Sequence, residues 1–341
     1  MHPREAKPEW LTVSRDLRAA IERTLGAPVV RAEPVWGGFG PNATFRLALA
    51  DEQDVFCKAH HPDNSAFIRS AVARECEIFG SCPEIHPFAP RFLGVARHDD
   101  EWALLLQFAG DRVAVPPWDD ARIDETLRLV LAVHALGSNG SPWPLWGLLT
   151  SWRELFSNAV MRVSFAALFS DPTAVARWLD DHGPRLLALE TAAPGVAWQA
   201  GALHLDLRSD NILYTRSRGP LLVDWPHFSR GPRALDIGFF APSVQAEGGP
   251  RASEFVRRYQ AAWGSTFRGA ELEAAAVVVA GFFAARAPLP ELADLPRLRW
   301  IQKVQLFPAL EWLCEVLSID WPATAPLATQ RPLDLDTSVN L

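Results

Sequence analysis

The sequence predicts an α+β fold with two lobes, a small antiparallel-sheet N-terminal lobe and a larger, mainly helical C-terminal lobe. Two observations favour this arrangement. Short strand-like segments separated by turn residues fill most of the first third of the chain. Beyond Asp119, apolar residues recur mainly at the spacing of amphipathic helices. With 341 residues, of which 49% are hydrophobic, the chain is long enough to bury a sizeable core.

The change of pattern sets the predicted domain limits. Residues 1–107 form the N-terminal lobe and residues 108–112 a hinge. Residues 113–322 form the helical lobe, and residues 323–341, which are rich in proline and threonine, form a loose tail.

The N-terminal elements are predicted from apolar spacing and turn residues. A helix is expected over residues 11–25, ending at Gly26. Three strands of an antiparallel meander follow, at residues 29–36, 43–49 and 55–59. A helix over residues 65–79 and two strands at 91–95 and 102–108 complete this lobe.

The C-terminal lobe shows six helical segments, near residues 123–136, 152–169, 174–189, 252–263, 272–285 and 298–316. Pro184 and Pro308 lie within two of them and should break or kink those helices. A compact non-helical stretch at residues 201–236 holds two short strands, at residues 212–215 and 221–223.

Composition excludes several classes of protein. The 33 basic and 40 acidic side chains give a formal net charge of −7, and no basic run offers a nucleic-acid surface. The four cysteines are scattered without a CxxC pair, which argues against a disulfide framework or a zinc site. The charged N-terminus and the short apolar runs predict a soluble, cytoplasmic protein with no membrane partner.

The most informative stretch is the string HLDLRSDNILY, which runs from His204 to Tyr214 and is followed by the segment LLVDW ending at Trp225. It resembles the catalytic loop and metal-binding segment of the protein-kinase-like superfamily. It is most similar to the aminoglycoside phosphotransferase and choline kinase-like small-molecule kinases, whose strings often read HGDxRxxNIL and then VDW. The resemblance covers about residues 30–290 and implies a two-lobed protein-kinase-like fold that uses ATP, or alternatively GTP, with Mg²⁺.

Phosphoryl transfer depends mainly on positioning and on charge neutralisation, which fits these residue types. Asp206 is expected to accept the proton of an attacking hydroxyl, and Arg208 to neutralise charge on the transferred group. Asn211 and Asp224 offer the oxygen ligands that Mg²⁺ prefers. Taken alone, an Asp-Asn pair in a loop is often turn chemistry, and the aspartate after the next strand favours the catalytic interpretation.

The N-terminal lobe supplies independent candidates for nucleotide binding. The backbone at Gly37, Gly38 and Gly40 is free to approach phosphates, although a glycine-rich hairpin turn is ordinary by itself. Lys58 is one of three lysines in a chain that otherwise uses arginine. Its place on a strand indicates a need for a compact ammonium, the alternative being an exposed edge-strand lysine.

Two further contacts follow from the resemblance. Glu75 matches the helix glutamate that pairs with the kinase lysine; Glu77 is the second choice, and a solvated helix face is the alternative for both. Gln107 and Ala109 fall where the hinge backbone holds an adenine ring.

Other positions in these strings are expected to be structural or depart from the family pattern. His204 braces the loop, and Asp236 holds it from the start of a helix. Leu205 replaces the glycine common in the phosphotransferase branch. Asp236 follows Asp224 too closely for a protein-kinase activation loop, so protein substrates are not expected.

The sequence therefore predicts a kinase that phosphorylates a hydroxyl of a small molecule, with an aminoglycoside or related amino-sugar antibiotic as the first candidate and antibiotic resistance as the implied role. Kinases of choline, homoserine, fructosamine or macrolides share these motifs and stay open. A catalytically silent nucleotide-binding protein is the alternative from another class.

Overall fold

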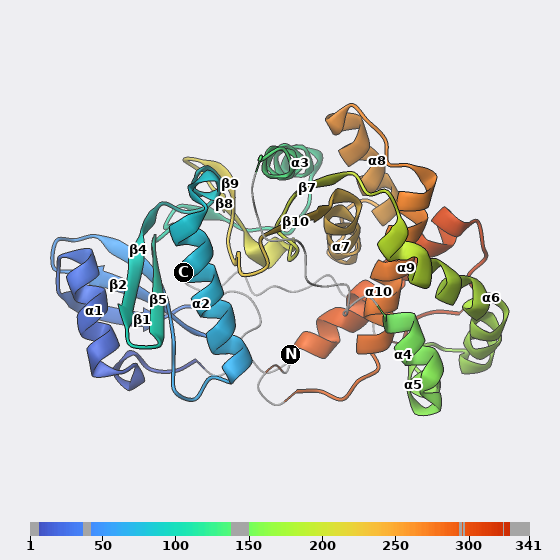
Figure 1. Cartoon of the computed structure of the whole chain (residues 1–341), viewed down its shortest axis with the longest axis horizontal. Coiled ribbons are helices and arrows are strands. Elements are labelled where there is room, and N and C mark those ends of the chain that lie inside the picture. Colours follow the sequence, from blue (N-terminus) through green and yellow to red (C-terminus); the bar gives the residue numbers. More distant parts are fainter. Residues whose placement is uncertain are drawn as a thin grey trace.

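The computed structural model covers the whole chain and describes residues 7–36, 42–137, 150–292, 295, 297–322 and 324–327. A five-stranded sheet with helices α1 and α2 lies at one end of the molecule, most of the other helices gather toward the opposite end, and α3 lies between them (Figure 1). The predicted α+β class with a small antiparallel sheet and a mainly helical second lobe is confirmed.

The N-terminal sheet is antiparallel throughout and has the strand order β1-β2-β3-β5-β4. Its strands are β1 (Val29–Pro34), β2 (Ala43–Leu49), β3 (Asp54–Ala59), β4 (Phe92–His98) and β5 (Glu101–Gln107). The first three form the predicted meander, and β5 inserts between β3 and β4.

Helices cover both faces of this sheet. Helix α1 (Arg15–Leu25) begins at Ser14, whose hydroxyl accepts a hydrogen bond from the amide of Leu17, and ends at the left-handed Gly26. It packs on the face to which Cys57 points. Successive strand residues point to opposite faces, so Lys58 faces the other helix, α2 (Ala66–Ser81).

Helix α2 shares its apolar core with the helical lobe. Val72, Cys76 and Phe79 are buried in one continuous cluster with Leu104 of β5 and the C-terminal helices. The separate cluster on the α1 side contains only residues of the N-terminal lobe. Helix α2 is therefore packed between the sheet and the second lobe, where its polar residues can reach both.

A second, three-stranded sheet connects the lobes. After β5 the chain forms the short strand β6 (Arg112–Val113), which pairs with β8 (Ile212–Thr215). Strand β8 pairs in turn with β9 (Gly219–Leu222), so the segment after β5 ends beside the strand that follows the catalytic string. Both strands expected at 212–215 and 221–223 are present, the second beginning and ending slightly earlier.

The C-terminal lobe contains the remaining described α-helices: α3 (Asp120–His134), α4 (Ser151–Ser157), α5 (Ala159–Ala166), α6 (Pro172–Ala192), α7 (Arg233–Ala246), α8 (Ala252–Trp263), α9 (Gly269–Arg286) and α10 (Leu298–Leu317). Short 3-10 helices lie at Trp10–Thr12, Pro83–Phe88, Ala193–Gly195 and Ser209–Asn211. In the part of the chain that the structure describes, no helix is both long and apolar enough to cross a membrane.

One prediction about these helices is wrong. The segment expected as one helix over residues 152–169 is two, because Asn158 leaves the helical conformation and its side chain caps α5. Of the break or kink expected at Pro184 and Pro308, the break does not occur, since α6 and α10 continue through both positions. Burial of the flanking apolar residues outweighs the lost backbone hydrogen bond.

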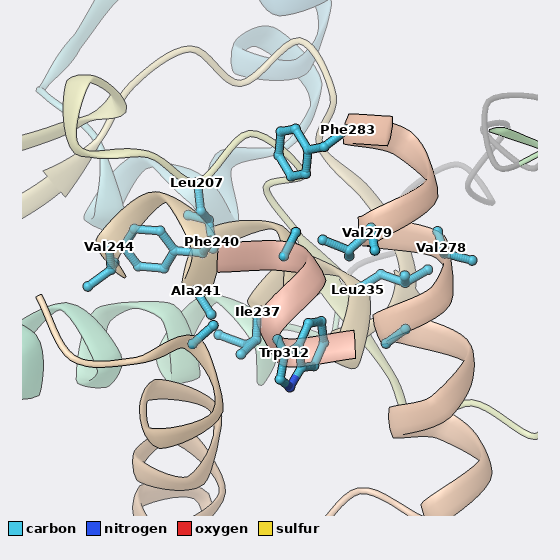
Figure 2. Close-up of a cluster of buried hydrophobic side chains, with 14 of the residues drawn as sticks. Leu207, Leu235, Ile237, Phe240, Ala241, Val244, Val278, Val279, Phe283 and Trp312 are labelled. Carbon is cyan, nitrogen blue, oxygen red and sulfur yellow. The ribbon is translucent and has the colours of Figure 1, made fainter. Parts of the chain in front are cut away.

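The sequence indicates the start of a helix at Asp236 but not the extent of α7, which continues to Ala246. Its residues from Ala234 to Val244 are buried on nearly every side, except for the partly buried Phe239, so no amphipathic period reveals it. Figure 2 shows Leu235, Ile237 and Phe240 of this helix within the central apolar cluster. Strands β7 (Ala200–Leu203) and β10 (Ser229–Pro232) pair just before α7 and enclose the catalytic string between them.

Candidate active site

One ammonium group joins the two lobes. Lys58 Nζ lies 2.7 Å from Glu75 Oε2 and 2.6 Å from Asp224 Oδ1. Lys58 comes from β3, Glu75 from α2, and Asp224 from the segment after β9. The side chains of Lys58 and Glu75 are 8% and 2% exposed, whereas that of Asp224 is 34% exposed. The ammonium of the buried Lys58 thus contacts a partly open carboxylate, that of Asp224.

Charge pairing decides the ionisation of this group. Burial alone would lower the pKa of Lys58, but the nearby charges of Asp224 and Glu75 outweigh it and raise that pKa above its usual value. Burial opposes ionisation of Asp224, yet the Lys58 and Arg208 charges hold its pKa below the ordinary range. Lys58 and Asp224 therefore stay charged at neutral pH.

Helix α2 is tied directly to the chain after Asp224. The amide of Trp225 donates to Glu75 Oε1 at 2.9 Å, so both carboxylate oxygens of Glu75 are engaged. Next to it, Arg74 Nε donates to the carbonyl oxygen of Pro226 at 2.8 Å. Glu75, not the exposed Glu77, is the glutamate that contacts Lys58.

The Asp206 carboxylate is held by two neighbours on the same loop. Arg208 contacts it through Nε at 3.1 Å and Nη2 at 3.3 Å, and Asn211 Nδ2 donates to Oδ2 at 2.9 Å. The same Asn211 nitrogen donates to the Asp206 carbonyl oxygen at 2.8 Å. The side chain of Asp206 is 31% exposed. The loop thus presents a fixed, partly open carboxylate, which is the form a general base requires.

Asn211 and Asp224 offer an oxygen donor set that fits Mg²⁺. The amide nitrogen of Asn211 is committed to Asp206, which leaves its carbonyl oxygen for another partner. The ammonium of Lys58 occupies Oδ1 of Asp224 and leaves Oδ2. The amide of Val223 donates to the main-chain carbonyl oxygen of Asn211 at 3.0 Å and so ties the two segments together. Carboxylate and amide oxygens are ligands typical of Mg²⁺.

Arg208 lies between two carboxylates. Besides Asp206, its Nη2 lies 3.4 Å from Asp210 Oδ2, and its side chain is 18% exposed. Burial raises the pKa of Asp210 to about 6, although the Arg208 charge opposes that rise. The guanidinium therefore holds the loop carboxylates, and its expected contact with a transferred phosphoryl group stays a prediction.

Two residues of the site have left-handed backbone conformations. Leu205 has φ 63° and Asp224 has φ 67°, a region that costs a non-glycine residue energy. Asp236, in the first turn of α7, accepts from the amides of His204 and Leu205 at 3.0 and 2.9 Å. These bonds hold the main chain of Leu205 in its left-handed conformation.

His204 acts as a brace, as the sequence predicts. Its Nε2 lies 3.0 Å from the Val223 carbonyl oxygen, and its ring packs edge-to-face on Trp225 at 4.7 Å. Burial lowers its pKa, against the raising effect of the nearby Asp236 and Asp206 carboxylates. A neutral, doubly engaged imidazole of this kind fits a structural role better than that of a base.

The remaining residues predicted to contact the nucleotide lie in the hinge segment and in the glycine-rich turn. Gln107 is the last residue of β5 and is exposed, and Ala109 follows in the segment leading to β6. Gly37, Gly38 and Gly40 lie outside the described residues. The hinge and phosphate-loop roles of these residues stay predictions.

Several residues around the loop escaped sequence reasoning. Asp236 is backed by His134, whose Nε2 lies 3.0 Å from it and whose Nδ1 lies 2.7 Å from the Tyr259 hydroxyl. Glu247, just after α7, accepts from Ser209 of the loop. These partners are distant in sequence, and only His134, a polar residue within an apolar stretch, carried a local signal.

Comparisons with known proteins agree with this arrangement. Residues 31–275 match the phosphotransferase enzyme family. No curated protein matches the chain in sequence.

Solved structures share the fold at low identity. An aminoglycoside-3'-phosphotransferase of type VIII is 20% identical, with 79% of this chain and 100% of that chain covered and a TM-score of 0.52. The GDP and kanamycin complex of APH(2")-IIia is 12% identical, with 89% and 99% covered and a TM-score of 0.56. A choline/ethanolamine kinase family protein from Mesorhizobium loti is 15% identical, with 89% and 98% covered and a TM-score of 0.56.

The family match spans most of the described chain, from β1 to the first part of α9, and includes both the Lys58 strand and the Asp206 loop. The chain belongs to the phosphotransferase enzyme family.

Proposed function

We propose that this phosphotransferase moves the γ-phosphoryl group of ATP, or of GTP, to a hydroxyl of a small molecule. The contact of Lys58 with both Glu75 and Asp224 carries the proposal, because it joins the sheet lobe to the segment beside the Asp206 loop. A paired, charged lysine next to a partly open carboxylate suits the binding of a triphosphate with its cation.

Each charged residue has one task in this mechanism. Lys58 binds and orients phosphate oxygens of the nucleotide. Asn211 and Asp224 would hold Mg²⁺, which when bound neutralises phosphate charge. Asp206 accepts the proton of the attacking hydroxyl, which makes that oxygen a better nucleophile. Arg208 and Asn211 keep the Asp206 carboxylate in place.

The nucleotide is held by backbone groups as well. Gln107 and Ala109 contribute the hinge contacts to the base, and Gly37, Gly38 and Gly40 contribute phosphate contacts. The complex of APH(2")-IIia with GDP supports including GTP among the donors to be tested.

An aminoglycoside or related amino-sugar is the first candidate acceptor. One structural neighbour is an aminoglycoside phosphotransferase and another was solved with kanamycin, which supports this class. A choline/ethanolamine kinase neighbour supports small amino alcohols as the second class. A catalytically silent protein is disfavoured, because Lys58, Asp206, Asn211 and Asp224 are all present and the described contacts join them in two linked clusters.

Two acidic residues of α10 share one arginine. Arg251 Nη2 lies 3.2 Å from Glu311 and 3.0 Å from Glu315. Gln245 also donates to Glu311 at 2.6 Å. One guanidinium balances only one of the two carboxylates, so Glu311 and Glu315 keep a net negative charge that suits an amine-bearing acceptor.

The test is a screen of acceptors with γ-labelled ATP and GTP in the presence of Mg²⁺. Aminoglycosides, choline, ethanolamine, homoserine, fructosamines and macrolides are offered separately, and Asp206→Asn serves as the matched inactive control. The proposal expects labelled product from one acceptor class, with turnover about 10²–10⁴-fold lower in the control. Nucleotide stabilisation without any transfer or hydrolysis would instead identify a silent binding protein.

A further inference from the structure

Helix α7 contacts the catalytic loop at three positions along its length. In its first turn, Asp236 accepts from the amides of His204 and Leu205. In its middle, Phe240 lies in the buried cluster into which the loop residue Leu207 points (Figure 2). The third contact lies at the far end of the helix, where Glu247 follows its last residue. The first contact fixes the main chain of the loop and the second packs its apolar side chain, and the third is made by the buried carboxylate of Glu247.

The Glu247 carboxylate connects three segments of the chain. It accepts from Ser209 Oγ at 2.6 Å through Oε1 and from Trp118 Nε1 at 2.7 Å through Oε2. Ser209 belongs to the catalytic loop, and Trp118 precedes α3. Glu247 is only 4% exposed, and burial raises its pKa to about 7, against the lowering effect of these two bonds. A carboxylate buried at such cost requires both partners.

The end of α7 is shaped to bring Glu247 to this position. Gly248 has φ +82°, and the amide of Gly249 donates back to the Val244 carbonyl at 2.9 Å, which closes the helix. A Cβ added to Gly249 would lie 2.5 Å from Val244 Cγ1 and 2.8 Å from Val244 O, and 3.4 Å from Trp118 Cβ. The missing Cβ at Gly249 thus lets the turn close against Val244, beside Trp118, whose indole nitrogen donates to Glu247.

Ser209 is placed where its anchorage affects the catalytic carboxylate. It lies between Arg208 and Asp210, which are ion-paired at 3.4 Å. Arg208 in turn contacts Asp206 through two nitrogens. A loop released at Ser209 loses the fixed backbone from which Arg208 reaches Asp206.

We propose that Glu247 is a positioning residue, which fixes the catalytic loop through Ser209 and thereby orients Asp206 for proton transfer. The catalytic part of this inference rests on the proposed function, whereas the anchoring of the loop does not. A displacement of about 1 Å at a positioned group is enough to cost roughly 100-fold in rate, so a remote hydrogen bond of this kind is measurable.

The experiment compares Glu247→Ala, Glu247→Gln and Ser209→Ala with the wild type. Glu190→Ala is the matched control, because Glu190 is also a buried carboxylate that accepts two bonds, from the amides of Trp152 and Arg153. Hydrogen exchange is followed in the peptide of residues 204–213 and in the strands β2 and β3. Turnover and KM are measured with the acceptor found by the screen, or by nucleotide hydrolysis without acceptor.

In Glu247→Ala we expect at least tenfold faster exchange in the loop peptide and a 10- to 100-fold lower kcat, with KM for the nucleotide changed less than twofold. Ser209→Ala shifts both in the same direction by a smaller factor. Glutamine accepts from Trp118 and donates to Ser209. In Glu247→Gln the exchange of the loop peptide and kcat should therefore lie within about threefold of the wild type. Glu190→Ala leaves the exchange of the loop peptide and kcat near those of the wild type.

Two results would overturn the inference. One is loop exchange and kcat in both Glu247→Ala and Ser209→Ala equal to those of the wild type. The other is faster exchange spread evenly over β2 and β3, with Glu190→Ala giving the same loss of kcat. A wild-type protein without turnover would contradict the proposed function, and the exchange of the loop peptide would still decide whether Glu247 anchors it.

Discussion

Lys58 of β3 lies 2.6 Å from Asp224, a residue 166 positions later in the chain, and 2.7 Å from Glu75 of α2. One ammonium therefore balances two carboxylates drawn from different elements. The Glu75 side chain is almost inaccessible, and the Asp224 side chain is one-third exposed. The buried Glu75 carboxylate thus depends on Lys58 to compensate its charge, whereas the partly exposed Asp224 carboxylate remains open to a ligand.

Removal of the lysine should destabilise the fold as well as nucleotide binding. Lys58→Ala leaves Glu75 buried beside Asp224 without a counter-charge, which should cost about 3–5 kcal/mol in the free energy of unfolding. Urea unfolding measures the loss. Arg46→Ala, which breaks the more exposed Arg46–Asp54 pair, is the control and should cost about 0–1 kcal/mol. The double variant Lys58→Ala/Glu75→Gln should regain part of the stability lost in Lys58→Ala, because it removes the uncompensated carboxylate. Equal losses in Lys58→Ala and Arg46→Ala would contradict this explanation.

Asp224 should make nucleotide binding depend on a divalent cation. In the wild type, ATP with Mg²⁺ should raise the melting temperature, and chelation with EDTA should remove most of that increase. Asp224→Asn loses the carboxylate charge and should show the same small increase with and without Mg²⁺. Differential scanning fluorimetry gives both values. A Mg²⁺-dependent increase preserved in Asp224→Asn would show that the cation binds elsewhere.

The raised pKa of Glu247 predicts a pH dependence of stability. Unfolded glutamate loses its proton near pH 4.5, whereas folded Glu247 keeps it up to about pH 7. The folded state binds more protons in this window, so stability falls as the pH rises, by about 1.4 kcal/mol per unit at most.

Glutamine at this position carries no titrating proton. The stability of the wild type relative to Glu247→Gln should therefore decline between about pH 5 and pH 7 and then level off, as measured by urea unfolding across that range. A difference that stays constant with pH would refute the assignment of the proton to Glu247.

Close packing in α9 predicts a local intolerance to a single methyl group. A Cβ at Gly281 would lie 2.7 Å from Cδ1 and from Nε1 of the fully buried Trp152, whose indole donates to the Val277 carbonyl. Gly281→Ala should lose about 1–3 kcal/mol despite the better helix propensity of alanine. Gly269→Ala, in the first turn of the same helix with open space around it, should stay within about 0.5 kcal/mol. Urea unfolding of both variants decides the point.

Local patterns in the sequence were enough to predict elements with a regular apolar period and a site residue whose type is rare in this chain. The strand meander followed from alternating apolar residues, and β2 occurs at the predicted residues. The rarity of lysine singled out Lys58, which the structure joins to Glu75 and Asp224. The spacing of Asp206 and Asn211 in one loop placed two residues that prove to be hydrogen-bonded.

The parts that the sequence does not predict depend on tertiary packing. Only the start of helix α7, at Asp236, was expected; its continuation shows no amphipathic period, because the helix is buried nearly all round. Glu247 and Ser209 meet only because α7 returns past the loop. The contact of Arg208 with Asp210 was likewise not predicted, because charge alone does not indicate which neighbouring carboxylate a guanidinium meets.

The contacts around helix α2 have a consequence for movement between the lobes. Glu75 is bonded to Lys58 and to the backbone of Trp225, and Arg74 is bonded to Pro226. One helix is thus joined both to the sheet and to the segment after Asp224, and a displacement of α2 has to break these bonds together. The helix, strand β3 and that segment should therefore move as one unit when the lobes shift.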